Sequence, residues 1–283
     1  MDITKFGGDS VKKLLSIIIK TELFGIIFTI FTLCFKLASI GVTGFAEGVL
    51  PIVFGNWYII TYILLFPLIP YANKFIQGLS QEEFKKLLLT IAIIYCIVPT
   101  FTLNMMINNF GGIAILIFTY FIGAYIRLFC NSLSTKKWLF LSIVGFVSMI
   151  IINMSILGIG YIQKSDRIIS QSCRFSEYNT IPAMLFSIGI FITFLKIKVN
   201  SEIIGRVVTL IGKSTFGIYL IHINTPAKFW LWNKPFDYFY SNSMPYLGAF
   251  IQIIVVFAFC SIVDTLYELT ISKIIKRALF CKS

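Results

Sequence analysis

The sequence has few charged residues, and only one of its residues is a histidine. Asp, Glu, Lys and Arg make up 13% of the 283 residues, whereas a typical soluble domain has about 25%. So few charged side chains cannot cover the surface of a soluble protein of this size, which excludes soluble globular, disordered and fibrous classes. Hydrophobic residues instead make up 58% of the chain, and the mean hydropathy is +0.89. This composition indicates a polytopic membrane protein.

Common catalytic and metal motifs are also missing. The sequence has no Walker sequence, no GxSxG, no HExxH and no CxxC, so neither coupling to nucleotide hydrolysis nor a metal site is expected. The six cysteines are scattered along the chain, and we interpret them as small apolar side chains. The net charge of +12 comes from small clusters between apolar runs rather than from one basic patch, so no nucleic-acid partner is expected.

Apolar runs of about 20 residues mark the segments that can cross a membrane as helices. Eight stretches qualify, and they predict an all-α, polytopic transmembrane helical bundle that forms a single domain over residues 1–283. Lys20 and Lys36 lie in the first stretch, close enough to its ends for their side chains to reach the membrane surface. The eight stretches are Leu14–Leu37, Val49–Tyr71, Leu87–Leu103, Gly112–Phe129, Trp138–Gly160, Thr180–Leu195, Val207–Asn224 and Tyr246–Leu269.

The distribution of basic residues predicts the orientation of these helices. One side of the predicted bundle collects 18 of the 24 Lys and Arg residues. Because basic residues gather on the cytoplasmic side, we expect a multi-pass protein of the cell membrane with both termini in the cytoplasm. The six basic residues on the opposite side are Lys36, Lys164, Arg167, Arg174, Lys228 and Lys234.

Three connections have distinctive compositions. On the predicted outer side, Tyr161–Asn179 mixes charged residues with serines, and Pro226–Pro245 is rich in Trp, Tyr, Phe and Asn. Aromatic rings beside amides and hydroxyls suit a carbohydrate, although an aromatic belt at the membrane interface has the same composition. On the inner side, Ser80 and Glu83 have the spacing of a capping box that begins the next helix.

The single histidine, His222, is the first candidate catalytic residue. On a helix, Thr215, Tyr219 and His222 share one face and form a polar stripe within an apolar segment. Imidazole is well suited to proton transfer near neutral pH, and a neighbouring tyrosine can orient it. The alternative is a structural histidine that is hydrogen-bonded to an adjacent helix.

Further polar residues in the apolar segments have either functional or structural interpretations. Tyr58, Thr61 and Tyr62 form a face that can look into the bundle, whereas Trp57 suits the membrane interface. Tyr120, Gly123 and Arg127 share another face, where Gly123 is expected to permit close helix approach and Arg127 to reach the membrane boundary. Asp264 and Glu268 need a nearby cation, from Lys273 or from another helix.

Four of these segments, in this order, resemble one known family. They are Asn56-Trp57-Tyr58 through Pro67 and Pro70, then Tyr120–Arg127 (YFIGAYIR), Ile211–His222 (IGKSTFGIYLIH) and Ile262–Ile274. Together they resemble the acyltransferase 3 family of integral-membrane O-acyltransferases, which modify surface polysaccharides and peptidoglycan. Members of that family usually begin with two further helices that carry an arginine and the main catalytic histidine. Because neither has a counterpart in this sequence, the resemblance also implies little turnover by this chain alone.

The resemblance implies transfer of an acetyl or similar acyl group from acyl-CoA to a hydroxyl of a surface glycan or lipid-linked sugar. No tightly bound cofactor is expected, since acetyl-CoA or another acyl-CoA is the donor. On this interpretation His222, which matches only the C-terminal signature, is the catalytic residue that the chain offers, and Trp57, Tyr58, Thr215 and Tyr219 contact the substrate. The phosphates of CoA would be held by Arg127, Arg206 and Lys213. A polysaccharide export or polymerisation component without acyl chemistry is the alternative.

Cysteine labelling tests the predicted orientation. A membrane-impermeant thiol reagent added outside the cell should label Cys173, which follows the fifth apolar stretch, and should not label Cys281 near the C-terminus. The opposite labelling pattern would contradict the orientation and would place the aromatic connections on the cytoplasmic side.

Overall fold

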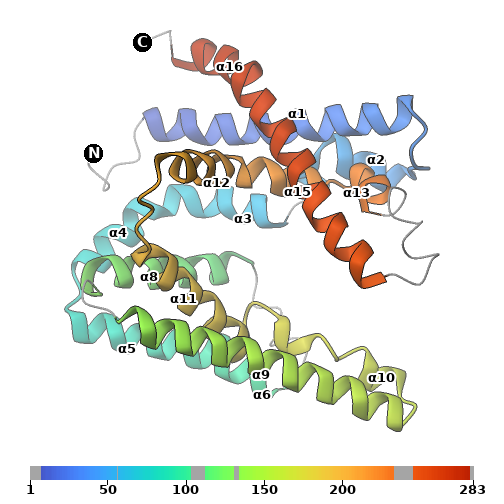
Figure 1. The fold of residues 1–283 in the computed structure, drawn as a ribbon. Coiled ribbons are helices and arrows are strands. Elements are labelled where there is room, and N and C mark those ends of the chain that lie inside the picture. Colours follow the sequence, from blue (N-terminus) through green and yellow to red (C-terminus); the bar gives the residue numbers. More distant parts are fainter. Residues whose placement is uncertain (1–7, 56, 103–111, 131–133, 233–244, 281–283) are drawn as a thin grey trace. The chain divides into compact units, whose positions relative to one another are not determined.

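The computed structural model describes residues 8–55, 57–102, 112–130, 134–232 and 245–280, and in these ranges it contains helices and no strand (Figure 1). Eight helical segments of the described chain are long and apolar enough to cross a membrane. This confirms the predicted all-α, multi-pass architecture. The segments are Ser10–Cys34, Trp57–Gln77, Gln81–Phe101, Gly112–Phe129, Thr135–Ile162, Asp166–Lys196, Glu202–His222 and Leu247–Ile275.

The helices divide into two compact units, the first within Met1–Pro67 and Val199–Ser283 and the second within Leu68–Lys198. The first unit is thus built from the two ends of the chain. Its elements are α1 (Gly8–Cys34), α2 (Val42–Val49), a π-turn (Pro51–Gly55), α3 (Trp57–Leu65), α12 (Glu202–His222), α13 (Thr225–Trp232), α15 (Pro245–Leu269) and α16 (Ile271–Phe280).

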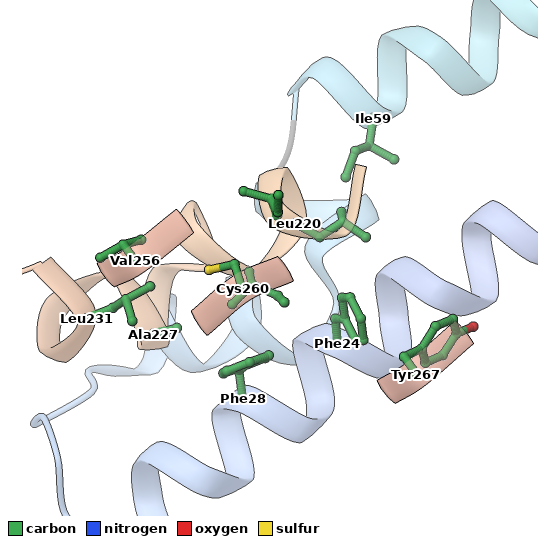
Figure 2. Close-up of a cluster of buried hydrophobic side chains, with 11 residues drawn as sticks. Phe24, Phe28, Ile59, Leu220, Ala227, Leu231, Val256, Cys260 and Tyr267 are labelled. Atoms are coloured by element: carbon green, nitrogen blue, oxygen red, sulfur yellow. The ribbon is translucent and has the colours of Figure 1, made fainter. Parts of the chain in front are cut away.

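A buried apolar cluster joins the helices of the first unit (Figure 2). Phe24 of α1 packs edge-to-face on Tyr267 of α15, with ring centroids 5.1 Å apart. Ile221 of α12, Ile59 of α3 and Cys260 of α15 are fully buried in the same cluster. The α12 helix is therefore packed between α1 and α15 along its C-terminal half, which ends at His222.

The second unit contains the middle of the chain. Its elements are α4 (Ile69–Gln77), α5 (Gln81–Ala92), a π-turn (Ile93–Ile97), α6 (Val98–Phe101), α8 (Gly112–Phe129), α9 (Thr135–Ile162), α10 (Asp166–Ile169), a 3-10 turn (Arg174–Ser176) and α11 (Ile181–Lys196). Where the chain passes from the first unit to the second, Phe66–Leu68 forms a short 3-10 helix that contains Pro67.

Glycines bring α9 and α11 of the second unit close together. A Cβ atom on Gly145 would lie 2.7 Å from the backbone nitrogen of Phe186, and one on Gly189 would lie 2.7 Å from the carbonyl oxygen of Trp138. Such small residues allow membrane helices to approach closely, where interhelical hydrogen bonds become possible. Ser142 uses this proximity to donate a hydrogen bond of 3.0 Å to the carbonyl oxygen of Phe186.

Local signals in the sequence account for several helix boundaries. Ser80 and Glu83 form the predicted capping box at the start of α5, with the Ser80 amide 2.9 Å from the Glu83 carboxylate. Pro99 has no N–H group for the carbonyl of Tyr95, and the helix widens into a π-turn at this point. The second predicted stretch is also interrupted, by the π-turn that begins at Pro51.

The connection Tyr161–Asn179, which the sequence offers as a carbohydrate-binding segment, is held to α9 and α6 by hydrogen bonds. Asn153 donates to Ser176 over 2.7 Å and accepts from the amide of Phe175 over 3.1 Å. Arg174 donates to the carbonyl oxygen of Pro99 over 2.9 Å. The other aromatic connection falls mainly on residues 233–244, which lie outside the described residues, as do Asn56 and Cys281.

Candidate active site

His222 is the last residue of α12, and its ring is held by its own helix. The Nδ1 atom lies 2.7 Å from the carbonyl oxygen of Ile218. A carbonyl oxygen can only accept a hydrogen bond, so the proton of a neutral ring resides on Nδ1 and Nε2 keeps its lone pair. Because the side chain is only partly buried, this nitrogen suits the removal of a proton from a substrate hydroxyl.

An aromatic cluster surrounds the imidazole. The Tyr219 ring lies 5.9 Å from the His222 ring, and the Tyr58 ring lies 5.1 Å from that of Tyr219, both edge-to-face. On the other side, Trp232 of α13 lies 6.2 Å from His222 and donates from its indole nitrogen to the His222 carbonyl oxygen over 3.1 Å. Gln252 of α15 hydrogen-bonds the Trp232 carbonyl oxygen in turn. Four aromatic rings from α3, α12 and α13 thus form one contiguous group.

The other two predicted substrate residues, Thr215 and Trp57, are more exposed than the residues of this cluster. Thr215 is exposed, and its hydroxyl donates to the carbonyl oxygen of Gly212 over 2.8 Å. Trp57 contacts Tyr58 with ring centroids 6.0 Å apart, yet 52% of its surface is exposed, as expected for an interfacial residue. Thr61, one turn beyond Trp57, is buried and donates to the Trp57 carbonyl oxygen over 2.5 Å.

A small polar pocket is lined in part by the residues that follow His222 in the chain. It has a volume of about 40 Å³, and its lining includes Ile223, Asn224 and Thr225 together with Glu47 of α2. The Glu47 carboxylate accepts a hydrogen bond of 2.8 Å from the Thr225 hydroxyl. A water needs roughly 10–15 Å³ of such space, so the pocket has room for water or for a substrate hydroxyl.

Close contacts between α1 and α2 form the opposite wall of this pocket. A Cβ atom on Gly25 of α1 would overlap the carbonyl oxygen of Gly48, and one on Gly48 would overlap the Thr29 hydroxyl. These glycines therefore allow α2, with Glu47, to lie directly on α1. Sequence reasoning missed Glu47 and did not single out Trp232, although an acidic residue between Gly44 and Gly48 was a usable signal.

A buried ion cluster joins α1 to α15. Lys20 of α1 contacts Asp264 over 2.7 Å and Glu268 over 2.9 Å, both on α15. The Lys20 and Asp264 side chains are 9% and 1% exposed, so the sequence-based expectation that Lys20 extends to the membrane surface is wrong. The cation that Asp264 and Glu268 require comes from another helix, which confirms one of the two predicted alternatives.

Aromatic rings and one glycine complete this ion cluster. The Lys20 ammonium lies 5.0 Å from the ring centre of Tyr267, 5.8 Å from that of Phe24 and 5.9 Å from that of Phe216. Such distances are within the range of cation–π attraction. On α12, Gly217 packs directly against Asp264, whose carboxylate would overlap a Cβ atom at that position.

An open hollow of about 680 Å³ lies at the other end of α12. Its lining includes Ser201, Arg206 and Lys213, so it contains two of the three residues predicted to bind CoA. Arg206 forms an exposed ion pair with Glu202, one turn earlier on α12. Arg127, the third residue, is exposed near the end of α8 in the second unit.

A comparison with known protein families matches residues 10–265 to the acyltransferase 3 family, under the description acyltransferase domain. The chain belongs to this family. Searches of curated proteins and of solved structures returned no match. The matched residues include Lys20, His222 and Asp264, so the acyltransferase 3 domain contains both the aromatic cluster and the central ion pair. With its eight candidate spans, the chain is a multi-pass membrane acyltransferase.

Two glycines of α12 provide a matched test of the packing beneath His222. Gly217→Ala should lower the free energy of unfolding by about 1–3 kcal/mol, because the added methyl displaces the Asp264 carboxylate. Gly212→Ala should be neutral or stabilise by up to about 1 kcal/mol, because no atom lies within 4 Å of its Cβ position. The measurement is unfolding of the purified protein in mild detergent. Equal stability of the two variants would contradict the packing described for Gly217.

Proposed function

We propose that this acyltransferase moves an acetyl or similar acyl group from acyl-CoA to a sugar hydroxyl of a surface polysaccharide or of peptidoglycan. The observation that carries the proposal is the position of His222. Its Nδ1 is tied to Ile218, and its side chain lies within an aromatic cluster. The lining of a polar pocket includes Ile223, the residue that follows His222 in the chain. It is also the only imidazole among the 283 residues.

In the proposed reaction, Nε2 of His222 accepts the proton of the sugar hydroxyl as its oxygen attacks the thioester carbonyl carbon. The new carbon–oxygen bond forms, the carbon–sulfur bond breaks, and the thiolate of CoA takes up a proton as it leaves. A positioned base of this kind contributes about 10²–10⁴ to the rate. No step requires a metal ion or nucleotide hydrolysis.

The acceptor would approach through the aromatic cluster. Sugar rings have apolar faces that stack on aromatic side chains and polar edges that form hydrogen bonds. Tyr58, Tyr219 and Trp232 offer such faces near His222, and Glu47 with Thr225 offers polar partners in the adjacent pocket. We therefore place the acceptor sugar at the end of α12, with its reacting hydroxyl near Nε2.

The donor would approach from the start of the same helix. Lys213 and Arg206 precede His222 by nine and 16 residues, or about 14 Å and 24 Å along an α-helix. Their charges and the positive end of the helix dipole favour the phosphates of CoA in the open hollow. Thus α12 would hold the donor phosphates at one end and the reacting base at the other.

Substitution of His222 tests the proposed chemistry. Because little turnover is expected from the chain alone, the test uses membranes of the cell that makes this protein, with the native gene deleted and variants supplied in its place, under conditions where acylation is measurable. There His222→Ala should reduce transfer of labelled acetyl groups to surface glycan by about 10²-fold or more. The amount of folded protein should stay nearly unchanged. Lys228→Gln, at an exposed position of α13, is the matched control and should retain full transfer.

His222→Gln separates the catalytic interpretation from a structural one. Glutamine can keep a hydrogen bond but cannot take up a proton near neutral pH, so this variant should be as inactive as His222→Ala. A purely structural histidine would instead cost about 1–3 kcal/mol of stability when removed, and activity would fall only in proportion to folded protein. Full transfer by the glutamine variant would rule out His222 as the base.

A further inference from the structure

An apolar groove between α8 and α11 distinguishes the second unit. Its volume is about 300 Å³, and its lining includes Ile122, Gly123, Ile126, Met184, Ile188 and Phe191. The hydroxyl of Thr119, also in the lining, donates to the carbonyl oxygen of Ile115 over 2.9 Å. The groove therefore presents an almost entirely hydrocarbon surface.

Gly123 forms part of this groove because no described helix of the second unit packs against it. No atom lies within 4 Å of its Cβ position, so the close helix approach expected from the sequence is wrong. By contrast, Gly145 and Gly189 of the same unit are covered by neighbouring backbone at 2.7 Å. Among the described residues of the second unit, nothing fills the space over Gly123.

Basic residues gather at one end of the groove. Ile126, towards the end of α8, lines the groove together with Phe191, towards the end of α11. Burial raises the pKa of the Cys130 thiol, which follows α8, and the charge of Lys196 acts on it in the opposite direction. The ends of α8 and α11 thus lie together, and Arg127 is exposed near the end of α8.

The neighbouring helices add to the positive charge at this end. The packing of Gly189 on Trp138 brings the start of α9, with Lys136 and Lys137, near the end of α11. Within the described helices of the second unit, the acidic residues at this end are Glu82 and Glu83 of α5. They are followed by Lys85 and Lys86, and Glu83 is bound to Ser80.

We propose that this groove binds one acyl chain of an anionic phospholipid, whose phosphate is held by Arg127 and Lys196. An apolar groove with cations at one end matches an amphiphile with a hydrocarbon tail and a negative head. Basic pockets between membrane helices bind anionic headgroups in this way. A zwitterionic lipid would fill the same groove, but its headgroup would be attracted less strongly by the cations. This site is independent of the proposed acyl transfer, and it assigns Arg127 to a lipid rather than to CoA.

Lipid retention by the purified full-length protein tests the site. In native mass spectrometry from mild detergent, phosphatidylglycerol should be retained more strongly than phosphatidylcholine with the same acyl chains. Gly123→Leu fills the groove and should abolish this preference, whereas Gly158→Leu should not, because Gly158 is exposed on α9 with an equally open Cβ position. If Gly123→Leu fails to fold, Ser187→Leu fills the groove from α11 and should have the same effect.

Charge variants test the headgroup contacts separately. Arg127→Gln and Lys196→Gln should each weaken phosphatidylglycerol binding by about fivefold, the effect typical of one basic residue near an anionic lipid surface. Lys164→Gln, just beyond the other end of α9, should leave binding unchanged. The proposal is overturned by equal retention of the two lipids, or by a Gly123→Leu variant that behaves like Gly158→Leu. Displacement of phosphatidylglycerol by equimolar palmitoyl-CoA would also overturn it, because the occupant would then be an acyl-CoA.

Discussion

The first unit depends on an ion pair that is removed from solvent. Lys20 and Asp264 meet over 2.7 Å with side chains 9% and 1% exposed. In an apolar environment neither charge is tolerable without the other, so the two helices that carry them must lie together. A pair of hydrophobic residues would also join α1 and α15, but the two helices could then pack equally well in many alternative registers. The charges specify one register, and three aromatic rings around the Lys20 ammonium add cation–π attraction to it.

The position of the candidate base follows from this register. Asp264 lies against Gly217, where a side chain on α12 would not fit. His222 is five residues further along α12, or about 7.5 Å along the helix axis. Its carbonyl oxygen accepts from Trp232, and Trp232 is held by Gln252 of α15. The helix that carries His222 is thus fixed to α15 both at the ion pair and beyond the end of α12. Catalytic geometry benefits from such support because small displacements of a base cost much of its rate.

The sequence predicts the parts of this molecule that depend on local patterns. Eight apolar stretches, the Ser80–Glu83 capping box and the Tyr219–His222 pair all follow from spacing along one segment. Other features depend on which helices meet. Asp264 and Glu268 clearly need a cation, but only packing selects Lys20, which precedes Glu268 by 248 residues. In the same way, Gly123 matches the pattern of a packed glycine, and the structure leaves it uncovered. The glycines at positions 44 and 48 mark the segment that carries Glu47, but its place beside Thr225 emerges only from the fold.

A double-mutant cycle on Lys20 and Asp264 tests the central claim most directly. Lys20→Met, Asp264→Asn and the double variant would be unfolded in mild detergent by titration with a denaturing detergent. Lys20→Met leaves Asp264 buried without a cation and should be strongly destabilised, and Asp264→Asn leaves Lys20 with Glu268 alone and should also be destabilised. The double variant should be more stable than the sum of the single effects predicts, with a coupling energy of about 2–3 kcal/mol. Additive effects within about 0.5 kcal/mol would contradict the account, because they would mean that the pair does not hold α1 against α15.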